Sequence, residues 1–160
     1  MKLIKVTTDL QISVHEFPQG TYWEQNRKLK ELIGGGCSSY ETVKPRRLYT
    51  ELHHVPYATR IPGECVSMLV DEEGWMKDRP VANLAASHLY ESDIHGCLIV
   101  GNVLFVGGRD TGEGVDSCGL EESVFQTLYG QLEGLVQAIK GPVEGKCVEI
   151  EGPVQKGRKI

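Results

Sequence analysis

The sequence lacks the closely spaced cysteines of a zinc ribbon or a dithiol redox motif. Its five cysteines are scattered, with no C-x-x-C pair: Cys37, Cys65, Cys97, Cys118 and Cys147. Structural zinc sites and redox pairs both need neighbouring thiols. We therefore expect no metal ion and no cofactor, and we expect free thiols that serve as small buried hydrophobes, as at Cys65 and Cys97 on predicted strands.

The sequence also has no apolar run of membrane-spanning length and no excess of positive charge. Its 17 Lys and Arg residues face 22 Asp and Glu residues, which gives a net charge of −5. Residues 1–4 lead directly into a predicted strand, without the pattern of a secretion signal. General nucleic-acid binding needs a basic surface, and a membrane span needs about 20 apolar residues. We therefore expect a cytoplasmic protein that neither binds nucleic acid in general nor spans a membrane. Its net charge still permits a local basic site.

The pattern of hydrophobic residues predicts the sheet. Residues 2–7 and 11–17 alternate and predict a hairpin, and residues 65–70 form a short apolar, β-branched run typical of a buried strand. Residues 98–106 are the most hydrophobic run in the chain, interrupted at Gly101. This run predicts a core strand with a bulge or two strands joined by a tight turn. Gly74 is expected to supply a positive φ in the turn after residue 70.

Three stretches predict helices. Thr21 with Glu24 has the capping-box spacing, and the glycines at 34–36 are typical of a helix C-cap, because they follow the helix instead of leading into one as phosphate loops do. The stripe expected to be buried in this helix is Tyr22, Leu29, Leu32 and Ile33.

Residues 81–90 predict a second helix, with Pro80 in its first turn. Residues 120–140 carry a regular apolar stripe and predict a long helix ended by Gly141 and Pro142, followed by a strand at 147–150. The chain of 160 residues has the length of one domain. We predict a single α+β domain over residues 1–160, with a mixed, mostly antiparallel sheet and two to three helices packed on it.

A basic cluster lies in residues 40–50, between two tyrosines: Tyr40, Lys44, Arg46, Arg47 and Tyr49. Alternation around this cluster predicts extended segments, with Pro45 at an edge or a bulge. The cluster is either a charged sheet edge that prevents aggregation or an anion site. In the second case Arg46 or Arg47 grips a phosphate while a tyrosine stacks on a base.

The most glycine-dense stretch, residues 107–114, follows the predicted core strand. It is either a flexible connector or a ligand loop beyond a strand end, to which Arg109 and Thr111 would add anion contacts. It lacks the Gly-Lys-Ser/Thr ending of a nucleotide-hydrolase loop.

Two sets of histidines invite a chemical interpretation. His53 and His54 diverge on an extended segment without partners at ligand spacing, so we expect them to be solvated or hydrogen-bonded. Asp93 followed by His95 is the one arrangement that looks like a general base with its orienting carboxylate, although turns use such residues for local hydrogen bonds. A hydrolase would need these two groups to converge with a cysteine or with Glu72.

Several short motifs recur in the same order in a known family. They are residues 32–35 (LIGG), residues 69–74 (LVDEEG), Pro80 followed by Asn83, and residues 99–104 (IVGNVL). Over residues 1–108 the chain resembles a family of small phage and bacterial proteins, the domain of unknown function 3846. The resemblance implies an origin in a virus or mobile element, with 1–108 as a family-like core and 109–160 as an extension. One departure is Ala82, which separates Val81 from Asn83.

Without a nucleophile constellation, metal cluster or cofactor loop, the expected function is non-catalytic binding. Given the implied viral origin, we expect an accessory protein that counters host defence by inhibiting a host factor or by sequestering a nucleotide-type signal. The expected ligand contacts are Lys44, Arg46, Arg47, Tyr49, Arg109 and Thr111. Two alternatives stay open: a protein–protein inhibitor without a small ligand, and a small hydrolase using Asp93 and His95. A homodimer contact through the long helix is also compatible with the sequence.

Overall fold

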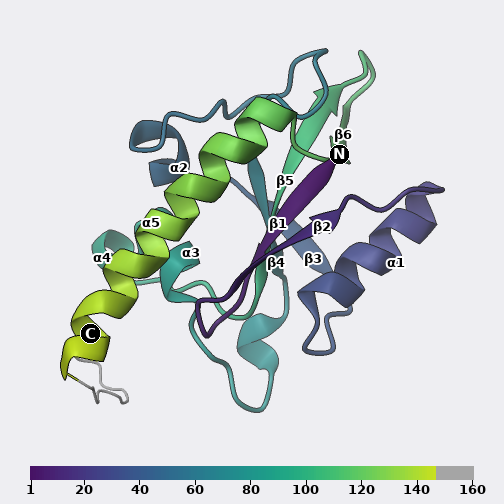
Figure 1. Cartoon of the computed structure of the whole chain (residues 1–160). Coiled ribbons are helices and arrows are strands. Elements are labelled where there is room, and N and C mark those ends of the chain that lie inside the picture. The colour runs from purple at the N-terminus through teal and green to yellow at the C-terminus, as the bar shows by residue number, and fades with distance from the viewer. Residues whose placement is uncertain (147–160) are drawn as a thin grey trace.

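The computed structural model describes residues 1–146 and has a six-stranded antiparallel sheet at its centre (Figure 1). The strand order is β2-β1-β5-β4-β3, and β6 pairs with the far end of β5. The strands are β1 (Lys2–Val6), β2 (Ile12–Glu16), β3 (Tyr40–Val43), β4 (Ser67–Asp71), β5 (Val103–Asp110) and β6 (Val115–Cys118).

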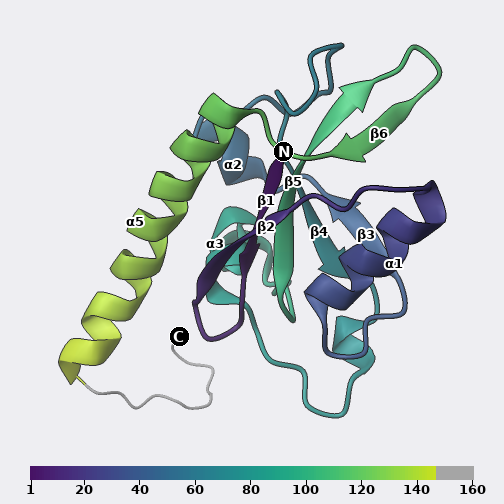
Figure 2. The ribbon, with the colours of Figure 1, turned by 45° about the vertical axis from the view of Figure 1, so that its right-hand side comes forward.

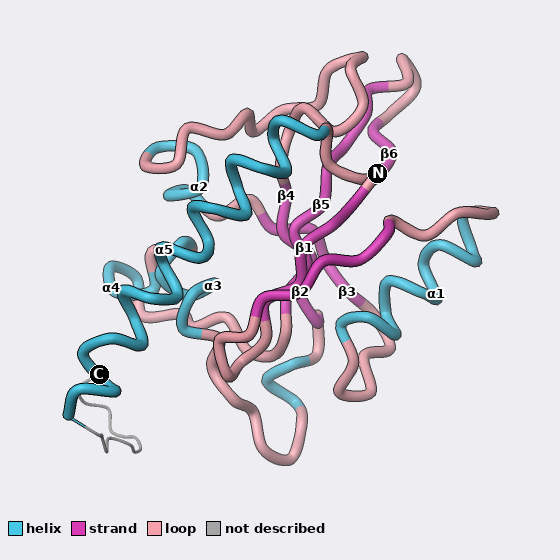
Figure 3. Tube along the Cα trace, in the orientation of Figure 1, coloured by secondary structure: helices cyan, strands magenta, loops and turns pink. Residues whose placement is uncertain are grey.

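Five α-helices and one 3-10 turn accompany the sheet (Figure 3). They are α1 (Tyr22–Ile33), α2 (Arg46–Thr50), η1 (Gly74–Met76), α3 (Leu84–Leu89), α4 (Ser92–His95) and α5 (Glu122–Lys146). The predicted α+β class is confirmed. The named strands all pair antiparallel, whereas a mixed, mostly antiparallel sheet was predicted. There are more helices than the two to three predicted, and three of them, α2, α3 and α4, have six residues or fewer.

The sheet lies between two helical layers, as Figure 2 shows. One face carries α5, α2 and α3, whose buried residues form a cluster with Ile4, Met68 and Phe105. The other face carries α1, the one named helix on that side within residues 1–146, which packs Leu29 and Ile33 onto a smaller cluster. Both clusters form because alternate residues of each strand point to opposite faces, so each face needs its own apolar cover.

The local signals at the N-terminal end of the chain are confirmed. β1 and β2 form the expected hairpin, with Lys2 opposite Glu16 and Val6 opposite Ile12. Thr21 caps α1 with the full capping box to Glu24, and Gly34 ends the helix at φ 75°. Tyr22 is an exception, because it was expected in the buried stripe and is 67% exposed.

The segment from 74 to 101 differs from the prediction in three ways. Gly74 begins η1 and does not adopt a positive φ. The helix predicted from 81 begins instead at Leu84, because the Asn83 side chain caps it by accepting from Ala86 N. Cys97, expected to be buried on a strand, lies exposed between α4 and β5. Gly101 adopts φ 90° at the turn before β5, so the predicted turn at this position is confirmed.

The glycine-rich stretch after the core strand is divided: residues 107–110 belong to a strand, and residues 111–114 form the turn of a hairpin. β5 continues through Gly107 and Gly108 to Asp110 and forms a hairpin with β6. A Cβ atom at Gly107 would lie 2.6 Å from Gly63 Cα and from Gly119 O. The glycine therefore allows the backbones of two loops to pack directly on the strand.

α5 begins close to the predicted start, with Leu128, Leu132 and Val136 among its buried residues. Gly141 and Pro142 do not end it, although a proline removes one backbone hydrogen bond of a helix. The predicted strand at 147–150 and the tail that follows lie outside the described residues. Within residues 1–146, no helix combines the length and the apolar character needed to span a lipid bilayer.

Candidate ligand-binding groove

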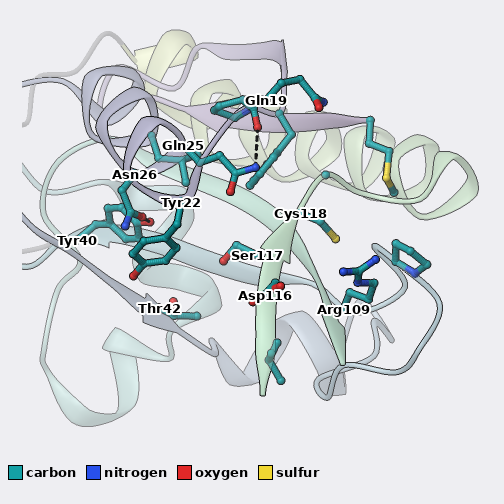
Figure 4. A pocket seen from close by; sticks show the side chains of 17 residues that line it. Gln19, Tyr22, Gln25, Asn26, Tyr40, Thr42, Arg109, Asp116, Ser117 and Cys118 are labelled. Atoms are coloured by element: carbon teal, nitrogen blue, oxygen red, sulfur yellow. Dashed lines mark hydrogen bonds between the residues drawn. The ribbon is translucent and has the colours of Figure 1, made fainter. Parts of the chain in front are cut away.

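A groove remains on the face of the sheet that α1 covers only in part. α1 has 12 residues and is therefore about 18 Å long. Its two buried residues, Leu29 and Ile33, lie in its C-terminal half. The N-terminal half stands away from the sheet and forms one wall of a hollow, while the β5–β6 hairpin forms the opposite wall (Figure 4).

This central hollow has a volume of about 690 Å³. Figure 4 shows Tyr22, Asn26 and Tyr40 together at one end of the hollow and Arg109 at the other. Polar residues from three elements line the space between, among them Gln25, Thr42, Asp116 and Ser117. The hollow thus offers aromatic rings at one end, a cation at the other and hydrogen-bonding groups between them.

Neighbouring groups hold two amide side chains at the tyrosine end. The Tyr40 hydroxyl donates to Asn26 Oδ1, and Gln25 Nε2 donates to Pro18 O over 3.1 Å. These bonds leave the Asn26 amino group and the Gln25 carbonyl oxygen for a ligand. Burial raises the pKa of Tyr40, so its hydroxyl keeps its proton and stays a donor at neutral pH.

Arg109 extends from β5 directly across from Asp116 on β6. No carboxylate among the described side chains forms a salt bridge with Arg109. Thr111, the other contact predicted in this stretch, uses its hydroxyl to donate to Gly114 O inside the hairpin turn. Arg109 therefore lines the hollow, whereas Thr111 shapes the turn beyond it.

A second hollow, the Lys44 hollow, adjoins the central one and has a volume of about 280 Å³. The two hollows share Thr42, Val115 and Ser117 as lining residues. Lys44 Nζ donates to Pro56 O over 2.8 Å and to Ser67 Oγ over 3.0 Å, which fixes the ammonium group at this site. The fold thus brings two predicted cations, Lys44 and Arg109, to one groove from positions 65 residues apart in the sequence.

The other members of the predicted basic cluster lie elsewhere. Arg46 and Arg47 are on helix α2 and not on a strand, because Pro45 provides the extended residue before it and Leu48 is buried in the core. Arg47 pairs with Asp93 and Glu51. Tyr49 donates its hydroxyl to Val66 O over 2.8 Å, and burial raises its pKa. The charged sheet edge predicted for these arginines is therefore wrong.

Asp93 and His95 do not form the predicted base and orienting carboxylate. Both carboxylate oxygens of Asp93 accept from Arg47. His95 donates from Nε2 to Tyr90 O over 2.6 Å, and its Nδ1 accepts from Cys97 N over 3.1 Å. Both ring nitrogens are thus engaged in the local turn, and Glu72 bonds to Ser39 instead of approaching them.

One thiol lines each of these two hollows, Cys118 in the central hollow and Cys65 in the Lys44 hollow. Burial raises the pKa of both groups, so they are thiols and not reactive thiolates at neutral pH. Among the residues that the structure describes, no three His, Cys, Asp or Glu side chains gather in a way that would hold a metal ion.

The sequence did not identify several groove residues as ligand contacts, notably Tyr22, Gln25 and Asn26. Tyr22 lies seven residues before Leu29 and so faces the same side of α1, which the helical period did reveal. The helical period does not reveal how far the apolar surface of the sheet extends beneath the helix. The local signal that the sequence does hold is an aromatic residue directly after the predicted N-cap, Thr21.

Comparison of the chain with models of protein families, with curated proteins and with solved structures found no match in any of the three. The resemblance of residues 1–108 to the domain of unknown function 3846 stays a prediction.

Proposed function

We propose that the protein acts by binding and that the central hollow takes a small anionic ligand with a flat ring, of the nucleotide type. The observation that carries the proposal is the placement of Arg109 at one end of a single hollow and of Tyr22 and Tyr40 at the other. The volume of about 690 Å³ lies in the ordinary range for small-molecule sites.

Each part of such a ligand has a matching group. The Arg109 guanidinium presents paired donors to a phosphate, and no carboxylate among the described side chains competes for it within salt-bridge distance. The exposed Tyr22 ring offers a face on which a base stacks. The amino group of Asn26 and the carbonyl oxygen of Gln25 supply one donor and one acceptor for the edge of the base.

The same geometry favours binding over catalysis. Catalysis by the cysteines or by His95 would need a thiolate nucleophile or a histidine with a free ring nitrogen. The thiols in the groove have raised pKa values, and His95 uses both of its nitrogens in a turn.

The biological part of the proposal rests on the resemblance of residues 1–108. We propose a viral accessory protein that works in the cytoplasm of the host cell and counters its defence by sequestering a nucleotide-type signal. In bacteria that carry a defence triggered by such a signal, expression of the protein should restore phage plaques, and the Arg109→Ala variant should not. If the wild type and the Arg109→Ala variant restored plaques equally, sequestration in this groove would be contradicted.

A second candidate function, inhibition of a host protein without a small ligand, is favoured by one surface. Trp75 and Met76 on η1 are 59% and 79% exposed, and Trp75 Nε1 reaches only to Leu98 O over 3.3 Å. Exposed aromatic side chains of this kind are common anchors at protein interfaces.

Titration calorimetry against a panel of linear and cyclic nucleotides tests the binding proposal. A charge-assisted contact contributes about 1.5–3 kcal/mol, so Arg109→Ala should weaken binding about tenfold or more. Arg46→Ala is the matched control, because Arg46 is exposed on α2 and does not line the groove. If the wild type binds no nucleotide, the ligand-binding proposal is wrong and inhibition of a host protein is favoured. If it converts the nucleotide to a product, the non-catalytic part of the proposal is wrong.

A further inference from the structure

The groove continues past the tyrosine end of the central hollow. A third hollow of about 430 Å³, the Trp23 hollow, lies along the outer side of α1 and is lined by Trp23, Arg27 and Lys30. It shares Asn26 with the central hollow, just as the Lys44 hollow shares Thr42 and Ser117 with it. The central hollow therefore has a neighbouring hollow on each side, with Asn26, which the Tyr40 hydroxyl holds, between it and the Trp23 hollow; the three hollows together are called the groove below.

Each part of the groove carries an exposed aromatic side chain. Trp23 is 77% exposed in its hollow, Tyr22 is 67% exposed in the central hollow and Tyr57 is 75% exposed in the Lys44 hollow. Large rings left this exposed gain little from the hydrophobic effect in the folded chain, so they are available as stacking surfaces. The three hollows thus have one exposed ring each, and the Tyr22 and Trp23 rings lie edge-on to each other with 5.4 Å between their centroids.

Each part also carries at least one cation without an ion-pair partner. The groove cations are Lys44, Arg109, Arg27 and Lys30, and none of them forms a salt bridge with a described side chain. Among residues 1–146, unpaired cations also occur away from these hollows, as at Arg46 and Arg79, so the groove differs in bringing four of them together and not in leaving them unpaired. Two carboxylates, Asp116 and Glu31, line the groove, so the charge of its side chains is positive although the chain carries −5.

We propose that this groove takes a short single-stranded oligonucleotide, linear or cyclic, with about one base in each hollow. The inference rests on the proposed function and extends it from a single nucleotide to a chain of two or three. Alternating rings and cations are the arrangement by which proteins hold single strands, because every base has a face to stack and every linkage carries a negative charge. A duplex does not fit this chemistry, since its bases are already stacked on one another.

Fluorescence anisotropy with end-labelled oligoadenylates of one to six nucleotides tests the inference. The affinity should rise about tenfold for each base added up to three, because one stacked base contributes about that factor, and it should then level off. Raising the salt concentration should weaken binding, with a logarithmic slope of about −0.7 for each phosphate contacted.

Two variants test whether the rise in affinity with added bases comes from the Trp23 and Lys44 hollows. Tyr57→Ala should remove about tenfold of the affinity for the trinucleotide and leave the affinity for the mononucleotide unchanged. Trp23→Ala should lower the affinity for the trinucleotide more than that for the mononucleotide, because the Trp23 ring also lies edge-on to Tyr22, with 5.4 Å between the ring centroids. Trp75→Ala is the control, since Trp75 is an exposed tryptophan outside the three hollows and should change neither affinity. Because all three side chains are exposed, the variants should keep the circular dichroism spectrum of the wild type.

The outcomes separate this inference from the proposed function. If the mononucleotide binds in an Arg109-dependent way and added bases bring nothing, the oligonucleotide inference is wrong and the proposed function stands. If neither mononucleotide nor trinucleotide binds, both fail. If a duplex or a polyglutamate peptide of equal charge binds as tightly as the single strand, charge and not base stacking determines binding, and the inference is overturned.

Discussion

Arg47 and Asp93 form a two-point ion pair that joins α2 to α4, with 2.6 Å between Nη1 and Oδ1 and 2.9 Å between Nη2 and Oδ2. The same guanidinium donates to His88 O on α3 over 2.8 Å and lies 3.3 Å from Glu51. The hydrogen bond with Arg47 lowers the pKa of Asp93, and the bond with Asp93 raises the pKa of Arg47. One side chain thus links three short helices.

This ion pair predicts a structural role for Arg47. Arg47→Ala should lower the midpoint of urea unfolding, because it leaves Asp93 and the His88 carbonyl without their donor. Arg46→Ala, one residue earlier on the same helix and exposed, should leave the midpoint nearly unchanged. A double-mutant cycle with Asp93→Ala should show coupling between the two residues. Unchanged stability of Arg47→Ala, or a loss of ligand affinity as large as that of Arg109→Ala, would contradict this division of roles.

Asn83 is a fully buried polar side chain that joins three segments. Its Nδ2 donates to Val6 O and to Gly101 O over 3.1 and 3.0 Å, and its Oδ1 caps α3 through Ala86 N. Asn83→Ala should lower the free energy of unfolding by about 3 kcal/mol, since it removes a helix cap and leaves buried carbonyls without donors. Denaturant titration measures the effect.

Asn102 provides the comparison for Asn83, because it bridges Thr8 N and Ile33 O in the same way but is only half-buried. Water can reach the groups that Asn102→Ala would free, so that variant should lose only about 1 kcal/mol. Equal losses in the two variants would show that burial does not decide the cost of removing these bonds.

His54 predicts a pH dependence of stability. Burial lowers its pKa from 6.5 in the folded chain, where Nε2 lies 2.6 Å from Gln131 Oε1. The unfolded state therefore binds a proton more readily, and the stabilisation is complete above pH 6.5 and lost as the pH falls through the folded pKa.

Urea unfolding at several pH values between 5 and 8 tests this prediction. In His54→Asn the dependence should shrink to the share of His15, whose pKa is lowered by burial and by Lys5. If His54→Asn and the wild type lose stability equally on acidification, His54 is not the group responsible.

Much of the local structure follows from the sequence because the energies involved are local. The capping box of Thr21 and Glu24, the C-cap at Gly34 and the turn at Gly101 depend on bonds and dihedral angles within a few residues. The β1–β2 hairpin likewise pairs residues no more than 14 positions apart. Such features have nearly the same energy in any surrounding fold, so the sequence predicts them.

Weak local preferences were decided by the tertiary structure. Residues 46–50 form a helix of five residues, too short to be stable alone, and the burial of Leu48 in the core selects it over a strand. The local sequence around Gly107 is typical of a connector, yet Gly107 lies in β5. Two loops pack directly against its backbone, which a side chain would prevent. In both places long-range packing outweighs propensity.

The sequence by itself determined the α+β class with a mostly antiparallel sheet, and it supplied the cationic residues from which a binding site would be chosen. Only the tertiary structure decided that Lys44 and Arg109 share a groove while Arg47 joins helices. It also decided that Tyr22, at the start of α1, is exposed. The physical reason is that a strand register and the length of a covering helix set which distant side chains meet, and neither quantity is contained in the residues of one segment.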